Sequence, residues 1–363
     1  MRWLPDSAVE RLREDADLPD LGDSKYAVIG KLGSGGMGTV YLAQDAELGR
    51  KVAVKVMNIA DPSGALASRM MREAQIIALL EHPGIVPIHD VGILDDGRVF
   101  YAMKLVHGRC LDESVDSASL ADLLRIFQKV CEAVAFAHSH GVIHRDLKPE
   151  NIMVGSFGEV LVMDWGVAKV LTGGRAEKDP ALPGMSDVSP EDIELGDTLQ
   201  LFGSVQGETG GGTIIGTPAY MPPEQAKGRT ELLDERSDVY ALGAILYFLL
   251  TGRPPSDAVD GSTTRATVPA AHPNRPRQIR SKIPKSIEAV CLKAMSEKQA
   301  DRYSGAEEMA RDVLNFLDGS PVSAYRENFV ETAGRWLAKN RFLVLLILAY
   351  LLMRVLVLFF LRR

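Results

Sequence analysis

Two short polar runs between residues 144 and 166 hold most of the side chains that could do chemistry in this chain. They read HRDLKPEN and DWG, and apolar, strand-like residues separate them. Asn151 and Asp164 supply the oxygen ligands that Mg²⁺ prefers. Asp146 can accept a hydroxyl proton, and Lys148 can neutralise charge on a phosphate group in transfer. Because polar groups beside apolar runs indicate a loop packed on a core, we interpret this cluster as a site for phosphate chemistry rather than as an ordinary turn.

A glycine-rich run over residues 33–40, GSGGMGTV, could approach phosphates through its backbone N–H groups, because few side chains intervene. A similar glycine spacing opens a helix in dinucleotide-binding folds. Here the β-type residues TVYL, 39–42, follow at once, which favours a turn between two strands. A plain hairpin turn is the alternative for this run taken alone.

A lysine at the end of an apolar strand-like run, Lys55 in VAVK, would be costly to bury without an anionic partner. Glu73 is the one carboxylate among the apolar positions of the helix-like segment 64–81. The two residues, if paired, would hold the ammonium against substrate phosphates. Either residue taken alone is more often a solvated surface charge.

The elements that must position these groups fall into two parts. Strand-like segments dominate from Tyr26 to about residue 105, and helix-like segments follow Gly108, notably 119–139, 237–250 and 286–295. A β-rich part followed by a helical part predicts two lobes, and the chain of 363 residues is long enough for them.

The charge balance and the cysteines exclude several classes of protein. The net charge of −7, from 41 Lys+Arg and 48 Asp+Glu, disfavours a nucleic-acid binder. Much of the acidic excess lies in segment 172–212, which has eight acidic and two basic residues and no sustained apolar period, so we expect a long loop there. The three widely spaced cysteines exclude a disulfide scaffold and a cysteine-based zinc motif, and we expect buried thiols in a reducing compartment: Cys110, Cys131 and Cys291.

The C-terminal segment 342–361 predicts a helix that spans a membrane once. Nineteen of its twenty residues are apolar or aromatic, the exception being Arg354, and basic residues flank both ends. Twenty helical residues measure about 30 Å, the hydrocarbon thickness of a bilayer. The insertion cost of Arg354, about 2.5–3.5 kcal/mol, is offset by the apolar residues around it. A core helix and an in-plane helix are the alternatives. The first 25 residues show no apolar signal-peptide core, so nothing there suggests export.

In their order along the chain, the motifs resemble those of eukaryotic-type protein kinases, specifically the bacterial Ser/Thr branch. The resemblance covers about residues 26–317. It rests on LGSGGMGTVY (32–41), VAVK (52–55), HRDLKPEN (144–151), DWG (164–166), GTPAYMPPE (216–224), SDVYALG (237–243) and Asp301-Arg302.

The resemblance implies an α+β, bilobal kinase fold. We expect the following divisions: an N-terminal extension (1–25), a β-rich N-lobe (about 26–106), a helical C-lobe (about 107–317) with an activation-loop insert (172–212), a basic juxtamembrane linker (318–341) and the membrane helix (342–361).

The resemblance also implies a role for each matching residue. Asp146 would be the catalytic base and Lys148 would meet the γ-phosphate, while Asn151 and Asp164 would hold Mg²⁺, with Mn²⁺ as a substitute. Met103 falls at the gatekeeper position, before the hinge. The ATP contacts would be Leu32, Gly33, Ser34, Gly35, Gly36, Met37, Gly38, Thr39, Val40, Ala53, Lys55, Glu73, Met103, Leu105 and Met153, and Asp112 would contact the ribose.

Regulation is expected in the long loop. Arg145, beside the base, offers a cationic pocket that a loop phosphate could fill. Thr209 and Thr213 are placed like the activating threonines of the bacterial branch, which predicts autophosphorylation there. Lys148, together with Thr217 in the segment before Glu224, resembles the pattern of Ser/Thr rather than Tyr kinases. Ordinary loop threonines are the alternative.

Three C-lobe residues are implied to be structural, and two residues depart from the family pattern. Glu224 and Arg302 would form an ion pair, and Asp238 would brace the catalytic loop. Trp165 replaces the usual Phe, which could change how the magnesium-binding segment flips, and Pro222 replaces the usual Ala, which we expect to matter little.

The sequence therefore predicts an active Ser/Thr protein kinase that uses Mg·ATP and protein substrates. We expect it at the cytoplasmic membrane, with the kinase domain in the cytoplasm, and with a homodimer as a route to trans-autophosphorylation. The alternatives are a pseudokinase scaffold at the membrane and a small-molecule kinase of similar fold. The motif segment 216–224, which resembles a peptide-docking segment, disfavours the second alternative.

Overall fold

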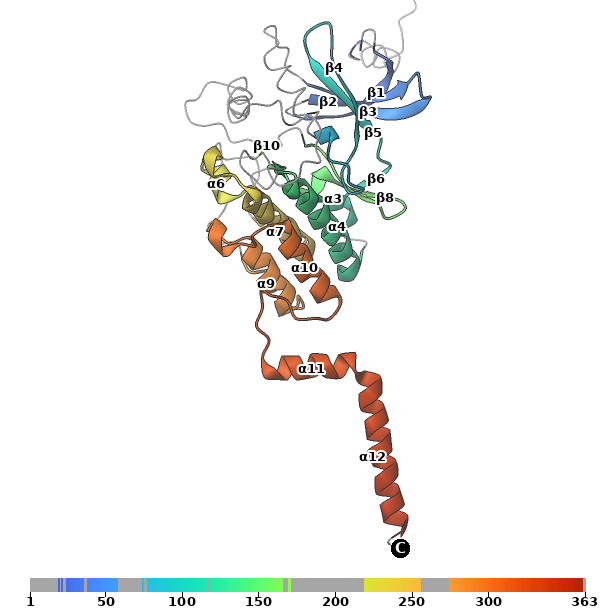
Figure 1. Ribbon diagram of the computed structural model, residues 1–363, viewed down its shortest axis with the longest axis vertical. Coiled ribbons are helices and arrows are strands. Elements are labelled where there is room, and N and C mark those ends of the chain that lie inside the picture. The colour runs from blue at the N-terminus through green and yellow to red at the C-terminus, as the bar shows by residue number, and fades with distance from the viewer. Residues whose placement is uncertain are drawn as a thin grey trace, which may run out of the picture.

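The computed structural model describes residues 24–35, 38–57, 77–115, 118–165, 169–170, 219–255 and 274–361, together with Pro19, Leu21 and Ala74. It has a β-rich lobe, a helical lobe below it and two helices that lead away from the second lobe (Figure 1). Most of the predicted N-terminal extension 1–25 and all of the predicted insert 172–212 lie outside the described residues.

The N-terminal lobe is built on a five-stranded antiparallel sheet in the order β1-β2-β3-β5-β4. Its strands are β1 (Tyr26–Gly35), β2 (Gly38–Asp45), β3 (Arg50–Met57), β4 (Ile88–Ile93) and β5 (Val99–Lys104). Alternating apolar residues on β2 and β3 bury one face, where Ala43, Val52 and Val54 are fully buried. Gly38 allows β2 to approach β3 closely, since a Cβ at this position would lie 2.6 Å from the carbonyl oxygen of Val56.

The C-terminal lobe has two small antiparallel sheets beside its helices. The strands are β6 (Gly108–Cys110), β8 (Ile152–Gly155) and β9 (Val160–Val162) in one sheet, and β7 (Val142–Ile143) and β10 (Lys169–Val170) in the other. The helices are α3 (Leu111–Ser114), α4 (Leu120–Ser139), η1 (Pro149–Asn151), α6 (Pro223–Ala226), η4 (Thr230–Leu232), α7 (Glu235–Thr251), α8 (Pro276–Ile279), α9 (Lys285–Ala294), η5 (Gln299–Asp301) and α10 (Ala306–Leu317).

Helix α7 is the central helix of this lobe. It is apolar around most of its circumference, and it packs against α4, α9 and α10, which explains the burial of nearly every one of its residues. The Asp234 side chain caps its first turn together with Ser237. Gly252 ends it in the left-handed conformation, with φ 75°, which a glycine adopts without strain. A rigid, buried helix is thus available to hold polar groups at its N-terminal end.

A buried ion pair joins Glu224 of α6 to Arg302, the residue that follows η5. The Arg302 guanidinium donates two hydrogen bonds to the Glu224 carboxylate, at 2.8 and 2.9 Å, and the Ser237 hydroxyl donates a third at 2.8 Å. Burial raises the pKa of Glu224. The hydrogen bond and charge of Arg302 lower this pKa by more than burial raises it, so that it lies below its ordinary value. The charged form of this carboxylate is therefore the stable one.

The cysteines are free thiols in the described chain. Cys131 and Cys291 are fully buried, and Cys110 is partly buried. Burial raises the pKa of the Cys131 and Cys291 thiols above their ordinary value, which makes these thiols inert.

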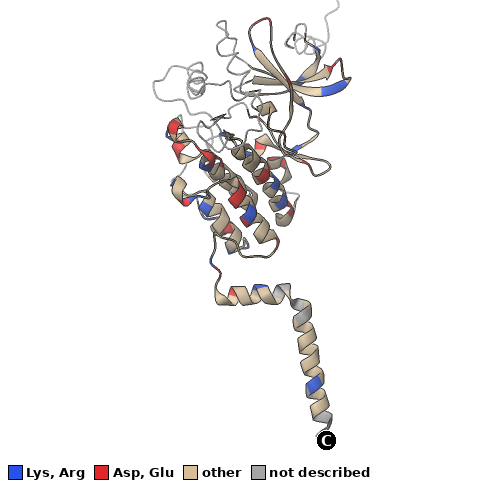
Figure 2. Cartoon of the chain, in the orientation of Figure 1, with Lys and Arg blue, Asp and Glu red and all other residues tan. Residues whose placement is uncertain are grey.

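Beyond the lobe, α11 (Phe329–Lys339) runs across its base, and α12 (Arg341–Leu361) leads away from it (Figure 1). An ion pair of 2.8 Å between Lys285 and Glu331 ties α11 to the lobe. Charged side chains are spread over the lobe and sparse on α12 (Figure 2). Among the residues that the structure describes, none of the helices has both the length and the apolar character needed to cross a membrane. The spanning helix that the sequence predicts at 342–361 is therefore not supported.

The Glu224–Arg302 pair predicts a large loss of stability when one partner is removed. Arg302→Met would leave a buried carboxylate without its counter-charge, so we expect the free energy of unfolding to fall by about 3–5 kcal/mol. The matched control is Arg311→Met on α10, which breaks an exposed pair with Glu307 and should cost only about 0.3–0.5 kcal/mol. Urea denaturation measures both variants, and equal losses would contradict a structural role for the buried pair.

Candidate active site

The HRDLKPEN run forms a loop between β7 and β8, and Asp238 of α7 holds this loop through hydrogen bonds to its backbone. The backbone N–H groups of His144 and Arg145 donate to the two oxygens of the Asp238 carboxylate, at 2.7 and 2.9 Å. His138, on the last turn of α4, lies 2.9 Å from the same carboxylate. Burial raises the pKa of Asp238, but the hydrogen bond and charge of His138 and the contacts with His144 lower it below its ordinary value. An ionised, buried carboxylate therefore sets the path of the loop.

Arg145 has a left-handed backbone, with φ 71°. This conformation is strained for a residue other than glycine and persists only where neighbouring contacts enforce it. Here Asp238 accepts from the Arg145 N–H, and the Gln225 side chain donates to the Arg145 carbonyl at 3.1 Å. The chain bends at Arg145, just before Asp146.

Asp146, Lys148 and Asn151 form one hydrogen-bonded group. The Lys148 ammonium lies 2.8 Å from the Asp146 carboxylate. The Asn151 amide donates to the backbone carbonyl of Asp146 at 2.8 Å and to its carboxylate at 3.3 Å. Because the amide nitrogen faces Asp146, the amide oxygen of Asn151 remains available as a metal ligand.

Asn151 and Asp164 are brought together by a backbone hydrogen bond. The N–H of Met163, next to Asp164, donates to the Asn151 carbonyl at 2.8 Å. His144 lies 2.9 Å from the carbonyl of Met163, so the DWG segment is attached to the catalytic loop at two points. Asp164 itself has φ 58°, a left-handed conformation that Asp tolerates better than most residues.

Lys55 of β3 forms an ion pair with Asp164, and the pair joins the two lobes. Lys55 is only 6% exposed. Burial lowers the pKa of Lys55, but the charges and hydrogen bonds of Tyr101 and Asp164 raise it above its ordinary value. Burial raises the pKa of Asp164, and the charge and hydrogen bond of Lys55 lower it below its ordinary value. Both groups are charged, as phosphate and metal binding requires.

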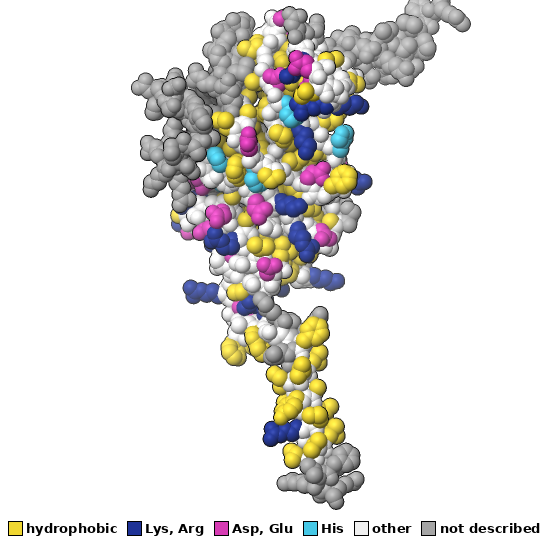
Figure 3. All heavy atoms as spheres, turned by 45° about the vertical axis from the view of Figure 1, so that its right-hand side comes forward, with side chains coloured by type: hydrophobic (Ala, Val, Ile, Leu, Met, Phe, Trp, Pro, Cys, Tyr) yellow, Lys and Arg dark blue, Asp and Glu magenta, His cyan; other side chains and the backbone are white. Residues whose placement is uncertain are grey.

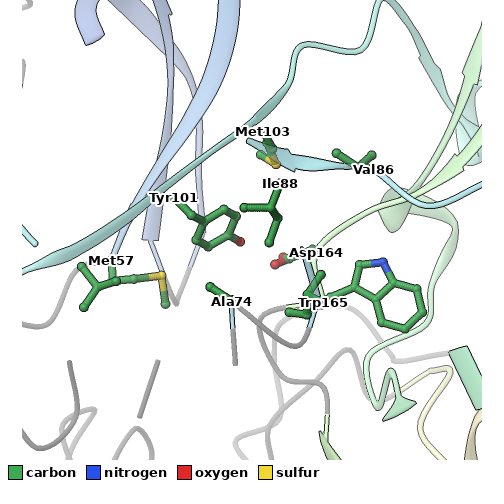
Figure 4. Close-up of a pocket in the computed structure, with 10 residues that line it drawn as sticks. Met57, Ala74, Val86, Ile88, Tyr101, Met103, Asp164 and Trp165 are labelled. Carbon is green, nitrogen blue, oxygen red and sulfur yellow. The ribbon is translucent and has the colours of Figure 1, made fainter. Parts of the chain in front are cut away.

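A small cavity of about 30 Å³ lies behind this ion pair. Figure 4 shows Asp164, Trp165 and Tyr101 around it, with Met103, the predicted gatekeeper, on its edge. Trp165 is buried, its indole N–H donates to the Val162 carbonyl at 3.2 Å, and its ring lies 4.6 Å from that of His144. The tryptophan that replaces the usual phenylalanine is therefore anchored by a hydrogen bond as well as by packing.

A second hollow, of about 610 Å³, opens beside the segment that joins the lobes. Leu32 of β1 and Leu105, both predicted ATP contacts, line it together with Val154 and Gly155 of β8. Of the other predicted ATP contacts, Val40 is on β2, Ala53 on β3 and Met153 on β8. These strands lie on both sides of the junction, as an adenine pocket between the lobes requires.

The glycine-rich run forms the hairpin between β1 and β2. Its register pairs Gly33 with Val40, Ser34 with Thr39 and Gly35 with Gly38. No heavy atom lies within 4 Å of the Cβ position of Gly33, so the backbone there is open to a ligand. The predicted contacts Gly36, Met37 and Glu73 and the predicted regulatory threonines Thr209, Thr213 and Thr217 lie outside the described residues.

A divalent metal fits the residues of this site. The Asp164 carboxylate and the Asn151 amide oxygen are hard ligands, and Mg²⁺ is commonly bound by one or two protein groups together with phosphates and water. The part of the chain that the structure describes has no group of three or more His, Cys, Asp or Glu side chains that could hold a metal ion.

Three supporting residues were missed by the sequence analysis: His138, Gln225 and Tyr101. His138 is the one histidine inside an otherwise apolar helix face, which was a usable signal. Gln225 contacts Arg145 from 80 residues away, and Tyr101 resembles any aromatic residue of a buried strand. Their contacts depend on the tertiary fold.

Similarity to known proteins covers most of the chain. The model of the protein kinase domain matches residues 26–314. The serine/threonine-protein kinase PknD of Protochlamydia amoebophila is 33% identical over 344 residues, which cover 87% of this chain and 32% of that protein. PknD of Chlamydia trachomatis serovar D is 36% identical over 319 residues, covering 82% and 32%. The chain thus spans about a third of the length of these relatives.

A solved structure of the PknI kinase domain of Mycobacterium tuberculosis has a TM-score of 0.57 and 26% identity, and it covers 83% of this chain and all of that domain. The bilobal fold, the ordered motifs and the family match agree. The chain belongs to the protein kinase family and carries a kinase domain of the bacterial serine/threonine type.

Proposed function

We propose that the chain transfers the γ-phosphate of ATP to serine and threonine hydroxyls of proteins. The observation that carries this proposal is the hydrogen-bonded group of Asp146, Lys148 and Asn151, connected through Met163 to Asp164 and its ion pair with Lys55. These groups together supply a base, a positive charge for the transferred phosphoryl group and metal ligands.

In the proposed reaction, the oxygen of the substrate hydroxyl bonds to the terminal phosphorus of ATP, and the Asp146 carboxylate accepts the proton that this hydroxyl loses. The bond from that phosphorus to the bridging oxygen breaks, and ADP leaves. Lys148 stabilises the charge on the transferred group. Asn151 and Asp164 would hold Mg²⁺, or Mn²⁺ in its place, which would neutralise charge on the nucleotide phosphates. Lys55 orients the phosphates from the N-terminal lobe.

The chain also has a surface suited to membrane attachment. Apolar side chains of α12, such as Leu346, Leu348 and Leu352, are exposed. Figure 3 shows apolar side chains along the face of this helix that is in view. An exposed apolar surface of this length is costly in water and is stabilised by contact with lipid. We therefore place the kinase, as a proposal, on the cytoplasmic side of the cytoplasmic membrane, with α12 in contact with the bilayer.

Activation by phosphorylation in trans, within a homodimer, is the proposed regulation. Arg145 is buried beside the base, where a phosphate on the 172–217 segment could approach the loop that carries Asp146. Thr209 and Thr213 are the proposed acceptors.

Asp146→Asn tests the catalytic assignment. Loss of the base should lower kcat by about 10²–10⁴-fold, because general-base catalysis contributes that much, and should leave the KM for ATP within about threefold. The measurement is ³²P incorporation into a generic Ser/Thr protein substrate. Asp122→Asn, on the exposed N-terminus of α4, is the matched control and should retain wild-type activity. Wild-type activity in Asp146→Asn would remove Asp146 from its role, and absence of transfer by the wild-type protein would favour a pseudokinase scaffold.

Trans-autophosphorylation has its own test. A tagged Asp146→Asn copy, incubated with the active protein and ATP, should acquire phosphate on Thr209 or Thr213, which peptide mass spectrometry detects. The matched control is the same copy with both threonines changed to alanine. Phosphate only on the active copy would argue against transfer between molecules.

Membrane attachment predicts that the full chain pellets with membranes and resists extraction by high salt. Changing Leu345, Leu346, Leu351 and Leu352 to Gln removes exposed apolar surface from α12, and we expect this variant in the soluble fraction. Kinase activity measured in both fractions controls for folding. Wild-type protein in the soluble fraction would contradict attachment, whereas resistance to alkaline carbonate would distinguish an inserted helix from one that lies on the surface.

A further inference from the structure

Lys55 needs more than one partner in its buried setting. Its ammonium has three N–H donors, and Asp164 accepts from one of them. An unsatisfied ammonium donor in a buried setting is costly. When nucleotide and metal are bound, the Asp164 carboxylate would also be a metal ligand, so its hold on Lys55 would weaken. A second fixed acceptor would then keep the ammonium in place.

Tyr101 occupies the position that such an acceptor requires. The β3–β5 register pairs Lys55 directly with Tyr101, and paired residues of neighbouring strands project from the same face. The Lys55 ammonium lies 6.0 Å from the centre of the tyrosine ring, and the Tyr101 hydroxyl is among the groups that raise the pKa of Lys55. Figure 4 shows the same hydroxyl directed toward Asp164. The backbone ladder fixes the spacing of Lys55 and Tyr101.

The surroundings of Tyr101 make its hydroxyl effective. The cavity beside it, of about 30 Å³, has space for about one water molecule, and Met57, Ile77 and Val99 give it apolar walls. Hydrogen bonds are stronger electrostatically where little water competes. A phenylalanine would fill this apolar space equally well, so the packing of the ring does not require the hydroxyl.

We propose that Tyr101 is a positioning residue for Lys55: its hydroxyl holds the ammonium in the cleft between the lobes, so that Lys55 can meet nucleotide phosphates while Asp164 binds the metal. This inference rests on the nucleotide site proposed above.

Tyr101→Phe tests the proposal because it removes the hydroxyl and keeps the ring. The full-length protein is titrated with ADP in the presence of Mg²⁺ by calorimetry, which measures binding without phosphoryl transfer. We expect Tyr101→Phe to bind about tenfold more weakly, as the loss of a hydrogen bond to a charged group implies. The melting temperature without nucleotide should change by less than about 2 °C, because the core packing is retained.

A double-mutant cycle separates positioning from packing. In a Lys55→Met background, Tyr101→Phe should cause no further loss of affinity, because the ammonium it positions is absent. Tyr26→Phe is the matched control: it removes a hydroxyl that donates to Asp90 in the same lobe, at 3.2 Å, and should leave ADP affinity unchanged.

Unchanged ADP affinity in Tyr101→Phe, or an equal loss in the Lys55→Met background, would overturn the role of Tyr101 and leave the nucleotide site standing. A wild-type protein that binds no ADP would overturn the nucleotide site itself, and this inference with it.

Discussion

The arrangement of the active site depends on one buried carboxylate. Asp238 is 1% exposed, and it accepts hydrogen bonds from two consecutive backbone N–H groups of the catalytic loop. A buried charge is stable only where several donors compensate its desolvation, and these donors together with His138 do so. Because the donors belong to His144 and Arg145, the carboxylate also imposes the left-handed backbone of Arg145. The position of Asp146 thus follows from a residue that touches no substrate.

The ion pair between Lys55 and Asp164 connects the two lobes. Lys55 comes from the sheet of the N-terminal lobe, and Asp164 from the segment after β9 in the C-terminal lobe. Each charge is stable in the cleft because the other is present. The two halves of the candidate site are consequently coupled, and a movement of one lobe relative to the other would alter the positions of both Lys55 and Asp164. Tyr101 adds a contact to this pair from within the N-terminal lobe alone.

The sequence allowed the chemistry to be predicted better than the contacts that support it. Asp146, Asn151 and Asp164 lie within 21 residues, so their types and spacing were informative before any fold was known. The predicted pairing of Lys55 with Glu73 stays a prediction, because Glu73 lies outside the described residues. The pairing of Lys55 with Asp164, 109 residues away, was not predicted. His138 meets Asp238 across 100 residues. Such pairs depend on how helices and sheets pack, and a single sequence carries no direct record of that packing. For segment 342–361 the sequence predicted more than the structure supports: its apolar composition predicts a membrane span, and the described residues do not support one.

Trp165 changes the balance of forces on the DWG segment. Asp164 has a left-handed backbone, and such a conformation needs compensating contacts. The indole N–H of Trp165 supplies a hydrogen bond to Val162 that a phenylalanine could not make, and its ring packs on His144, which also contacts the carbonyl of Met163. Turning the segment outward would break this bond and expose a large aromatic ring, which costs more free energy than exposing a phenyl ring. The substitution therefore stabilises the position in which Asp164 meets Lys55, and it makes departure of Asp164 from the cleft less favourable than the same movement would be with phenylalanine.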